Sequence, residues 1–491
     1  MTVAGAAAAV HYANAGLTVS HYDARAHLVV ARRVFDSLWP GWQQIGGVWL
    51  PLPHLLNMVP VQVDAWYRNG ASGVAISVLS MATAAWALAA LIIRITRSRI
   101  AAMTGATLMM ANPNLLYLQS TPMTEPLLFA TALVAIAFTA EWLDRDVVEA
   151  PGSGDPGRRI ASTSGWMKPG LALAAACMTR YEALPITAAI VALSCAVLLR
   201  RGASARTTLA AAARLSALPL LALVLFTINS RWTTGYWFIP RDFYVPENVE
   251  ALGHPMEAWR QVREGLYRLS GTALVWPAYG GLAMVSIAFL RSRARAPLVL
   301  VAALAAAALL PWYAYLQGHP FRIRYDVPLV AACAALAAAG VALTPALLRP
   351  LVATAIVVAS LLQAPPLDRS APVVVESQRD ARNMEGRRAV TAYLQQQYDG
   401  NTIMMSMGSL AHYMHDLSLA GFNVRDFLHE GNGELWPYAT HGARSIVGWV
   451  IIEEHAEGGD SLFTQRHRSQ RFLEGFERVA EGGGVALYRV R

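Results

Sequence analysis

Charged and aromatic residues stand at the ends of several long apolar runs in this sequence. The first such group lies in "SHYDARAHLVVARR", and its members are His21, Asp23, Arg25 and His27. A carboxylate fixed beside histidines can act as a general base that takes a proton from a hydroxyl group. The same position also suits a helix N-cap, for which Ser20 and Thr18 compete. From the residues alone, both interpretations of Asp23 stay open.

Two further acids show the same ambiguity. Glu125 in "QSTPMTEPLLFA" follows Pro122, and an acid shortly after a first-turn proline is ordinary at a helix start. In "MTRYEALP", Arg180, Tyr181 and Glu182 interrupt an apolar stretch. Ionisable groups flanked by apolar helix are costly and tend to mark sites, although Arg180 and Glu182 pairing only with each other is the alternative.

The third group is rich in arginine. "SRWTTGYWFIPRDFY" contains Arg241, and "GHPFRIRYDVPL" contains His319, Arg322, Arg324 and Tyr325. Singly, each arginine can extend to lipid phosphates. Together on one face, opposite a carboxylate, they predict a site that holds a phosphate by charge-assisted hydrogen bonds.

Other reactive residues give weaker signals. His412 and His415 have a spacing that can bind a metal on a helix, but two isolated histidines are more often ordinary surface residues. Three cysteines lie in apolar runs and are expected in the core. The sequence has no phosphate loop, no dinucleotide fingerprint and no metalloprotease helix. Metal binding therefore stays undecided.

The composition places these groups in a membrane protein. The 491 residues are 55% hydrophobic and only 15% charged, with a mean hydropathy of +0.36. The formal charge of +8 comes almost wholly from arginine, which we interpret as membrane topology and not as nucleic-acid binding. About eleven apolar runs are long enough, or nearly so, to span a bilayer. They cover residues 1–19, 71–93, 100–118, 122–143, 170–180, 183–199, 207–228, 271–290, 296–316, 327–341 and 351–362.

Arginine-rich connections alternate along the chain and fix an orientation. They lie near Arg97, Arg145, Arg200, Arg293 and Arg349, and such connections collect in the cytoplasm. This puts the opening stretch, Glu125, residues 180–182, 230–270 and 319–326 outside. Treating 170–199 as one helix would invert everything downstream, and we favour two helices. Abundant alanine and near-total use of arginine for lysine suggest a GC-rich bacterium, hence its cytoplasmic membrane.

The regions between and after the spans differ in character. Residues 20–70 form a surface loop, in which a helix starting at Asp23 is expected along the membrane surface and a second one over 52–63. Residues 1–364 are predicted as the membrane domain, 365–378 as a proline-rich linker and 379–491 as a soluble extracytoplasmic α/β domain. Its expected elements are a helix over 380–397, strands in "NTIMMSMG" and "SIVGWVIIEE", and a hairpin about 482–484.

The motifs "HYDARAHLVVARR", "TEPLLFA", "TRYEALP" and "RIRYDVPLV", in this order, resemble the GT-C superfamily of membrane glycosyltransferases. The similarity is to the group with protein O-mannosyltransferases and aminoarabinose transferases, and it covers most of residues 20–341. It implies a mainly α, polytopic fold with an amphipathic first outer loop. The implied reaction is inverting transfer of a sugar from a polyprenyl-phosphate donor to an acceptor hydroxyl at the outer face.

Carried onto this sequence, the resemblance assigns roles to the motif residues. Asp23 resembles the catalytic base and Glu125 a second acid in the pocket. The resemblance makes Arg180, Tyr181 and Glu182 lining residues, and it places Arg322, Arg324 and Tyr325 near the donor phosphate. Asp326 departs from the apolar residue expected there. The family implies no agreed metal, so a divalent cation stays open.

Two other classes of function remain. A transporter or flippase of lipid-linked saccharides would place polar groups near the bilayer midplane, in two related halves. A non-catalytic envelope scaffold would use Asp23 and Glu125 only as helix caps. The acceptor, whether glycan, lipid or protein, is not indicated by the sequence.

Overall fold

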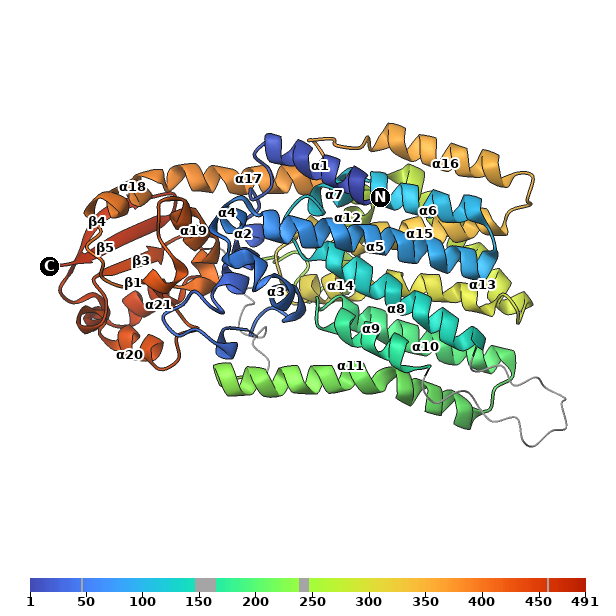
Figure 1. Cartoon of the computed structure of the whole chain (residues 1–491), viewed down its shortest axis with the longest axis horizontal. Helices are drawn as coiled ribbons and strands as arrows, with labels where there is room; N and C mark the ends of the chain where they lie inside the picture. The colour runs from blue at the N-terminus through green and yellow to red at the C-terminus, as the bar shows by residue number, and fades with distance from the viewer. Residues whose placement is uncertain (46, 146–164, 238–246, 457–458) are drawn as a thin grey trace.

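The protein consists of a long bundle of apolar helices with a small α/β domain at one end (Figure 1). The computed structural model describes residues 1–45, 47–145, 165–237, 247–456 and 459–491. The helices of the bundle are α1 (Thr2–Asn14), α5 (Ala71–Thr96), α6 (Arg99–Ala111), α7 (Pro113–Leu118), α8 (Glu125–Arg145), α9 (Met167–Cys177), α10 (Ala183–Arg201), α11 (Ala205–Thr234), α12 (Pro255–Ser270), α13 (Thr272–Arg291), the 3-10 helix η4 (Ala296–Ala308) with α14 (Leu309–Leu316), η5 (Ile323–Asp326), α15 (Pro328–Leu343) and α16 (Arg349–Gln363).

Every predicted apolar run overlaps one or two of these helices. Within the described residues, seven segments are long and apolar enough to cross a membrane, and α9 and α16 are shorter apolar helices. The run 100–118 is broken into α6 and α7 because Pro113 follows Asn112, whose side chain caps α7. The region 170–199, predicted as two helices, forms α9 and α10 with Arg180 between them.

α15 forms the centre of the bundle and packs against α13, α6 and η4. Its sequence is mostly alanine, and small side chains let helix backbones approach closely where there is no water to drive apolar burial. At the crossing with α13, a Cβ added to Gly281 would lie 2.0 Å from the backbone oxygen of Leu336. This crossing therefore requires glycine.

The two ends of the bundle differ in charge. Because the helices alternate in direction, Arg97, Arg200, Arg293 and Arg349 share one end, while Glu125 lies at the other with the C-terminal domain (Figure 1). The charged motifs of the sequence are thus brought to one end by the helix lengths alone.

The first loop forms α2 (Tyr22–Arg32), η1 (Trp42–Gln44), α3 (Leu52–Asn57), η2 (Pro60–Gln62) and α4 (Asp64–Asn69). Unlike a helix lying on a membrane surface, α2 is buried from Asp23 to Arg32. Its apolar side shares a core with α19 (Met407–Leu419) of the C-terminal domain, where Leu28 and Val29 join Leu410 and Met414. The domain therefore covers α2.

The C-terminal part forms α17 (Pro372–Gly386), α18 (Arg388–Gln397), β1 (Ile403–Met405), α19 (Met407–Leu419), η6 (Val424–Asp426), β2 (Phe427–Leu428), α20 (Leu435–His441), η7 (Ala443–Ser445), β3 (Trp449–Glu453), α21 (Ser461–Arg468), η8 (Gln470–Leu473), β4 (Phe476–Gly482) and β5 (Val485–Val490). The strand order is β2-β1-β3-β5-β4, with β2, β1 and β3 parallel and β3, β5 and β4 antiparallel. The predicted strands and the hairpin correspond to β1, β3, β4 and β5.

The segment expected as a linker over 365–378 includes the first half of α17. This helix begins at Pro372, a residue favoured at a first helical position, and it packs against α7, α2 and η5. The side-chain amide oxygen of Asn114 accepts a hydrogen bond from the backbone N–H of Val373 at 3.1 Å. The membrane and C-terminal parts are thus joined by a packed helix.

One buried ion pair adds to the apolar contact between α2 and α19. Arg25, 1% exposed, donates hydrogen bonds of 2.7 and 2.8 Å to the two carboxylate oxygens of Asp416. Removing one partner of a buried pair leaves the other charge uncompensated.

We expect Arg25→Ala to lower the free energy of unfolding by about 3 kcal/mol, because Asp416 would stay buried without its partner. The matched control is Arg68→Ala, whose side chain is exposed and whose pair with Asp64 spans 3.8 Å, and it should cost under about 0.5 kcal/mol. Thermal unfolding of the detergent-solubilised protein measures both. Equal shifts for the two variants would contradict the structural role of Arg25.

Candidate active site at the charged end of the bundle

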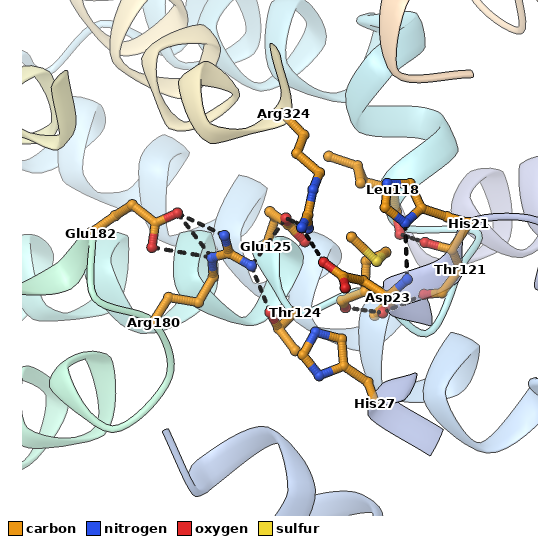
Figure 2. Close-up of polar contacts among 12 residues, drawn as sticks. His21, Asp23, His27, Leu118, Thr121, Thr124, Glu125, Arg180, Glu182 and Arg324 are labelled. Carbon is orange, nitrogen blue, oxygen red and sulfur yellow. Dashed lines mark hydrogen bonds and ion pairs between the residues drawn. The ribbon is translucent and has the colours of Figure 1, made fainter. Parts of the chain in front are cut away.

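Five ionised side chains from distant parts of the sequence meet at this end and alternate in sign (Figure 2). We call them the acid–arginine cluster, and in spatial order they are Asp23, Arg324, Glu125, Arg180 and Glu182. The helix starts of α2 and α8, the α9–α10 connection and η5 supply them. The cluster contains three carboxyl groups and two guanidinium groups, so it has one carboxyl group in excess.

Asp23 lies in the first turn of α2. The N-cap is His21, whose Nδ1 accepts a hydrogen bond of 3.1 Å from the backbone N–H of Asp23. The carboxylate of Asp23 is therefore not used as the N-cap. It forms an ion pair with the Nη2 of Arg324, and both side chains are nearly fully buried.

Glu125 begins α8 and is the most buried acid of the cluster, with no exposed surface. Its Oε1 lies 3.0 Å from Nη1 of Arg180 and 3.4 Å from Nη1 of Arg324. Its Oε2 accepts no hydrogen bond from the described residues. Glu125 thus links the two arginines and keeps one oxygen unused.

Arg180 completes the cluster through contacts on three sides. It lies 2.7 Å from Oε1 of Glu182, donates a 2.9 Å hydrogen bond to the hydroxyl of Thr124, and contacts Glu125. Burial lowers the pKa of Arg180, but Glu125 and Glu182 outweigh burial and raise its pKa above the ordinary value. The interpretation of Arg180 and Glu182 as an isolated pair is therefore incomplete, since Arg180 also holds Glu125.

The other residues of the "RIRYD" segment border the cluster. The guanidinium of Arg322 lies 6.0 Å from the ring centre of Tyr22, and that of Arg324 lies 5.2 Å from that of Tyr325. The ring of His319 is 5.3 Å from that of Tyr325, and burial lowers the pKa of His319. Arg322, His319 and Tyr325 are half-buried, so they form the accessible edge of the cluster.

Some of the predicted site residues contact other groups. Arg25 pairs with Asp416, and the hydroxyl of Tyr181 donates to the backbone oxygen of Val48 at 2.7 Å. The ring of His27 contacts His54 instead of Asp23, with 3.0 Å between their nitrogens. Arg241 lies outside the described residues.

Glu376 of α17 is a neighbour of the cluster that sequence reasoning missed. Its Oε1 lies 3.9 Å from Nε2 of His21. Burial raises the pKa of Glu376, but His21 and the charges of Arg324 and Arg322 outweigh burial, so its pKa is below the ordinary 4.5. No sequence signal pointed to Glu376, because it lies in the segment that was predicted as a linker and that forms the start of α17.

The pair His412 and His415 belongs to the interior of the C-terminal domain. His415 is fully buried and hydrogen bonds to the backbone oxygen of Tyr67 at 3.0 Å, and His412 contacts Arg387. Neither is an ordinary surface residue. Among the described residues, no group of three or more His, Cys, Asp or Glu side chains is arranged to hold a metal ion.

The depressed pKa of Glu376 predicts a pH-dependent stability. When the pKa of a carboxyl group is lower in the folded than in the unfolded state, its carboxylate stabilises the fold at pH values above the unfolded-state pKa. This contribution is lost as the pH falls through the folded-state pKa. We expect Glu376→Gln to lower the melting temperature at pH 7 and to lose this effect below about pH 4.5. Glu385→Gln, in the exposed part of the same helix, should have no such effect. A difference that grew in acid would contradict the assignment.

The close packing of Gly265 against Asp326 predicts that a larger residue at position 265 will destabilise the protein. A Cβ on Gly265 of α12 would lie 2.0 Å from the Oδ2 of Asp326, which is fully buried beside Arg324 and Tyr325. We expect Gly265→Ala to lower the free energy of unfolding by about 1–3 kcal/mol and to disturb the cluster. Gly280→Ala is the control, because nothing lies within 4 Å of its Cβ and alanine favours helix. Melting curves that ranked the variants in the opposite order would contradict this packing.

Comparison with known proteins gives a fold and no close relative. No family model matches the sequence, and no curated protein matches it. ArnT from Cupriavidus metallidurans bound to undecaprenyl phosphate is similar in structure, with a TM-score of 0.58 and 12% identity over 99% of this chain and 97% of that one. The apo form gives a TM-score of 0.60, also at 12% identity and the same coverage.

A third similar structure is the oligosaccharyltransferase of Archaeoglobus fulgidus in complex with zinc and sulfate. It has a TM-score of 0.51 and 13% identity, covering 87% of this chain and 63% of that chain. The similarity to ArnT includes the C-terminal domain, since it spans nearly the whole of both chains. The chain therefore shares the mainly helical fold of these transferase structures.

Proposed function

We propose that this protein is an inverting glycosyltransferase that moves a sugar from a polyprenyl-phosphate donor to an acceptor hydroxyl. The observation that carries the proposal is the pairing of Asp23 with Arg324 inside the acid–arginine cluster. One group is a base for the acceptor, and the other is a cation for the donor phosphate. They lie together, next to the half-buried Arg322 and His319.

The chemistry requires both groups at once. The acceptor oxygen forms a bond to the anomeric carbon while its proton passes to the carboxylate of Asp23. The bond from the anomeric carbon to the phosphate oxygen breaks, and its electron pair stays on the phosphate. Arg322 and Arg324 stabilise that negative charge. A phosphate leaves as an anion without being protonated, so a second acid is not needed as proton donor, unlike in most glycoside hydrolases.

The ion pair with Arg324 has a consequence for this mechanism. The carboxylate oxygen of Asp23 that pairs with Arg324 is not available to the acceptor hydroxyl while the pair is intact. When a donor phosphate competes for Arg324, Asp23 is released toward the acceptor. Glu125 and Arg180 then keep the remaining charges paired, so the cluster can open without leaving Arg324 isolated.

The lipid carrier fits the position of the cluster. A polyprenyl tail stays in the bilayer, and the cluster lies where seven apolar, membrane-length helices of the described chain meet the covered first loop. Undecaprenyl phosphate is the ligand of the similar ArnT structure, which supports a donor of this class. Arg97, Arg200 and Arg293 at the opposite end support a cytoplasmic location for that end, so we place the cluster and the C-terminal domain at the outer face of a bacterial cytoplasmic membrane.

The two other classes fit less well. A transporter would concentrate ionised groups and broken helices near the bilayer midplane, whereas this cluster lies at the helix ends. A scaffold that used its acids as caps would not pair the carboxylate of Asp23 with Arg324.

The proposal is tested with a radiolabelled polyprenyl-phosphate sugar and membranes that contain the protein. We expect Asp23→Asn to reduce sugar transfer by about 10²–10⁴-fold at equal expression, because the amide cannot accept the proton. Asp144→Asn is the control, since Asp144 pairs with Arg201 at the opposite end of α8. Equal activity of wild type and Asp23→Asn would exclude Asp23 as the base. Flux of the lipid-linked saccharide in proteoliposomes without transfer would favour the transporter.

A further inference from the structure

The first turn of α2 is capped by an uncommon residue. His21 is the N-cap, a position at which Ser, Thr, Asp and Asn are preferred. Its Nδ1 accepts the hydrogen bond from the backbone N–H of Asp23 (Figure 2). The ring of His21 has no exposed surface and stacks on the ring of Tyr22, with 4.9 Å between the ring centres. The backbone of the proposed base is therefore tied to a buried imidazole.

This cap requires one of the two neutral forms of the imidazole. Nδ1 can accept a hydrogen bond only when it carries no proton, so the proton of the neutral ring is on Nε2. A proton on Nδ1 would face the N–H of Asp23 and leave that helix-end donor without an acceptor. The group behind Nε2 therefore determines whether His21 can cap α2.

Glu376 is the group behind Nε2. Its Oε1 lies 3.9 Å from Nε2 of His21, and its side chain is 15% exposed. Neither of its carboxylate oxygens accepts a hydrogen bond from the described residues. Burial raises the pKa of Glu376, but His21 and the charges of Arg324 and Arg322 outweigh burial, so the group is ionised at neutral pH. A carboxylate at this position favours the proton on Nε2 over the proton on Nδ1.

The packing of α17 fixes the position of Glu376. The side-chain oxygen of Asn114 accepts a hydrogen bond from the backbone N–H of Val373, and neither Val373 nor Val374 has exposed surface. The helix packs against α2 in the first loop, α7 in the bundle and η5. Glu376 therefore approaches His21 from a helix that is held by both the first loop and the bundle.

The cap is most important during sugar transfer. In the structure Asp23 is held twice, by the cap on its backbone and by the ion pair of its carboxylate with Arg324. In the proposed reaction the donor phosphate competes for Arg324, so the cap then remains as a constraint on the direction of the carboxylate. A displacement of about 1 Å at a reacting group can lower a rate about 100-fold.

We propose that Glu376 is a positioning residue, which keeps His21 in the form that caps α2 and thereby directs Asp23 toward the acceptor hydroxyl. The inference rests on the proposed function and deepens it. A direct action on the donor site is the alternative, because the charges of Arg322 and Arg324 also act on Glu376. Loss of positioning lowers kcat, whereas loss of a donor contact raises the KM for the donor.

The kinetic test uses a radiolabelled polyprenyl-phosphate sugar and membranes that contain the protein, below the melting temperature of every variant. Disappearance of the labelled donor reports turnover with the acceptor that the membranes contain. We expect Glu376→Leu to lower kcat about 10–100-fold and to leave the KM for the donor within about twofold of wild type. Glu385→Gln, exposed near the end of the same helix, is the control and should match wild type.

A second background separates positioning from folding. His21→Asn replaces the imidazole by a preferred N-cap side chain, whose amide oxygen accepts the helix N–H without a carboxylate behind it. Within this background we expect Glu376→Leu to lower kcat by less than about threefold, because the two residues act through one contact. A residue that only stabilised the fold would cost the same activity in both backgrounds.

The form of His21 is measured without turnover by solid-state NMR of the protein in lipid, with isotope-labelled histidine side chains. The signal that is missing from His21→Asn belongs to His21. We expect this signal to show a proton on Nε2 alone in wild type and a mixture of both neutral forms in Glu376→Leu.

The outcomes separate the two proposals. An unchanged kcat in Glu376→Leu, an equal loss in both backgrounds, or a proton on Nδ1 of His21 in wild type would overturn the inference, while transfer by wild type upholds the proposed function. A rise in the KM for the donor at unchanged kcat would assign Glu376 to the donor site and overturn the inference. Wild type that does not convert the donor would overturn the proposed function and this inference together.

Discussion

The guanidinium of Arg324 is the group on which the arrangement at the charged end of the bundle depends. It contacts Asp23, 301 positions earlier in the sequence, and Glu125, so it joins the first loop to the start of α8 and to η5. Removing ionised groups from water is costly unless each finds a partner of opposite sign. The cluster meets this condition because carboxyl and guanidinium groups alternate from Asp23 to Glu182. This alternation requires all four backbone segments to be correctly placed.

The C-terminal domain takes part in that placement. It covers α2 with an apolar face and the pair between Arg25 and Asp416, and α17 brings Glu376 to the N-cap of the helix that holds Asp23. A helix lying free on a membrane would present Asp23 in many orientations. Burial between two parts of the protein restricts these orientations, and this gives the domain a role in the geometry of the site.

The sequence by itself determined the apolar helices, the end at which the charged motifs gather, most of the strands and four motifs of the cluster. These follow from local rules. The length of an apolar run determines whether its helix crosses the bundle, and therefore at which end the next segment begins, and the pattern of apolar residues determines which side chains are buried. Which charges pair was decided only by the tertiary structure: Arg25 and Arg324 both lie in charged motifs, but Arg25 pairs with Asp416, whereas Arg324 pairs with Asp23 and Glu125. The start of α17 was likewise hidden, since the segment from Pro372 to Gln378, predicted as part of a linker, forms a helix that packs on α7 and α2. Pairing between distant residues depends on three-dimensional proximity, which no local pattern encodes.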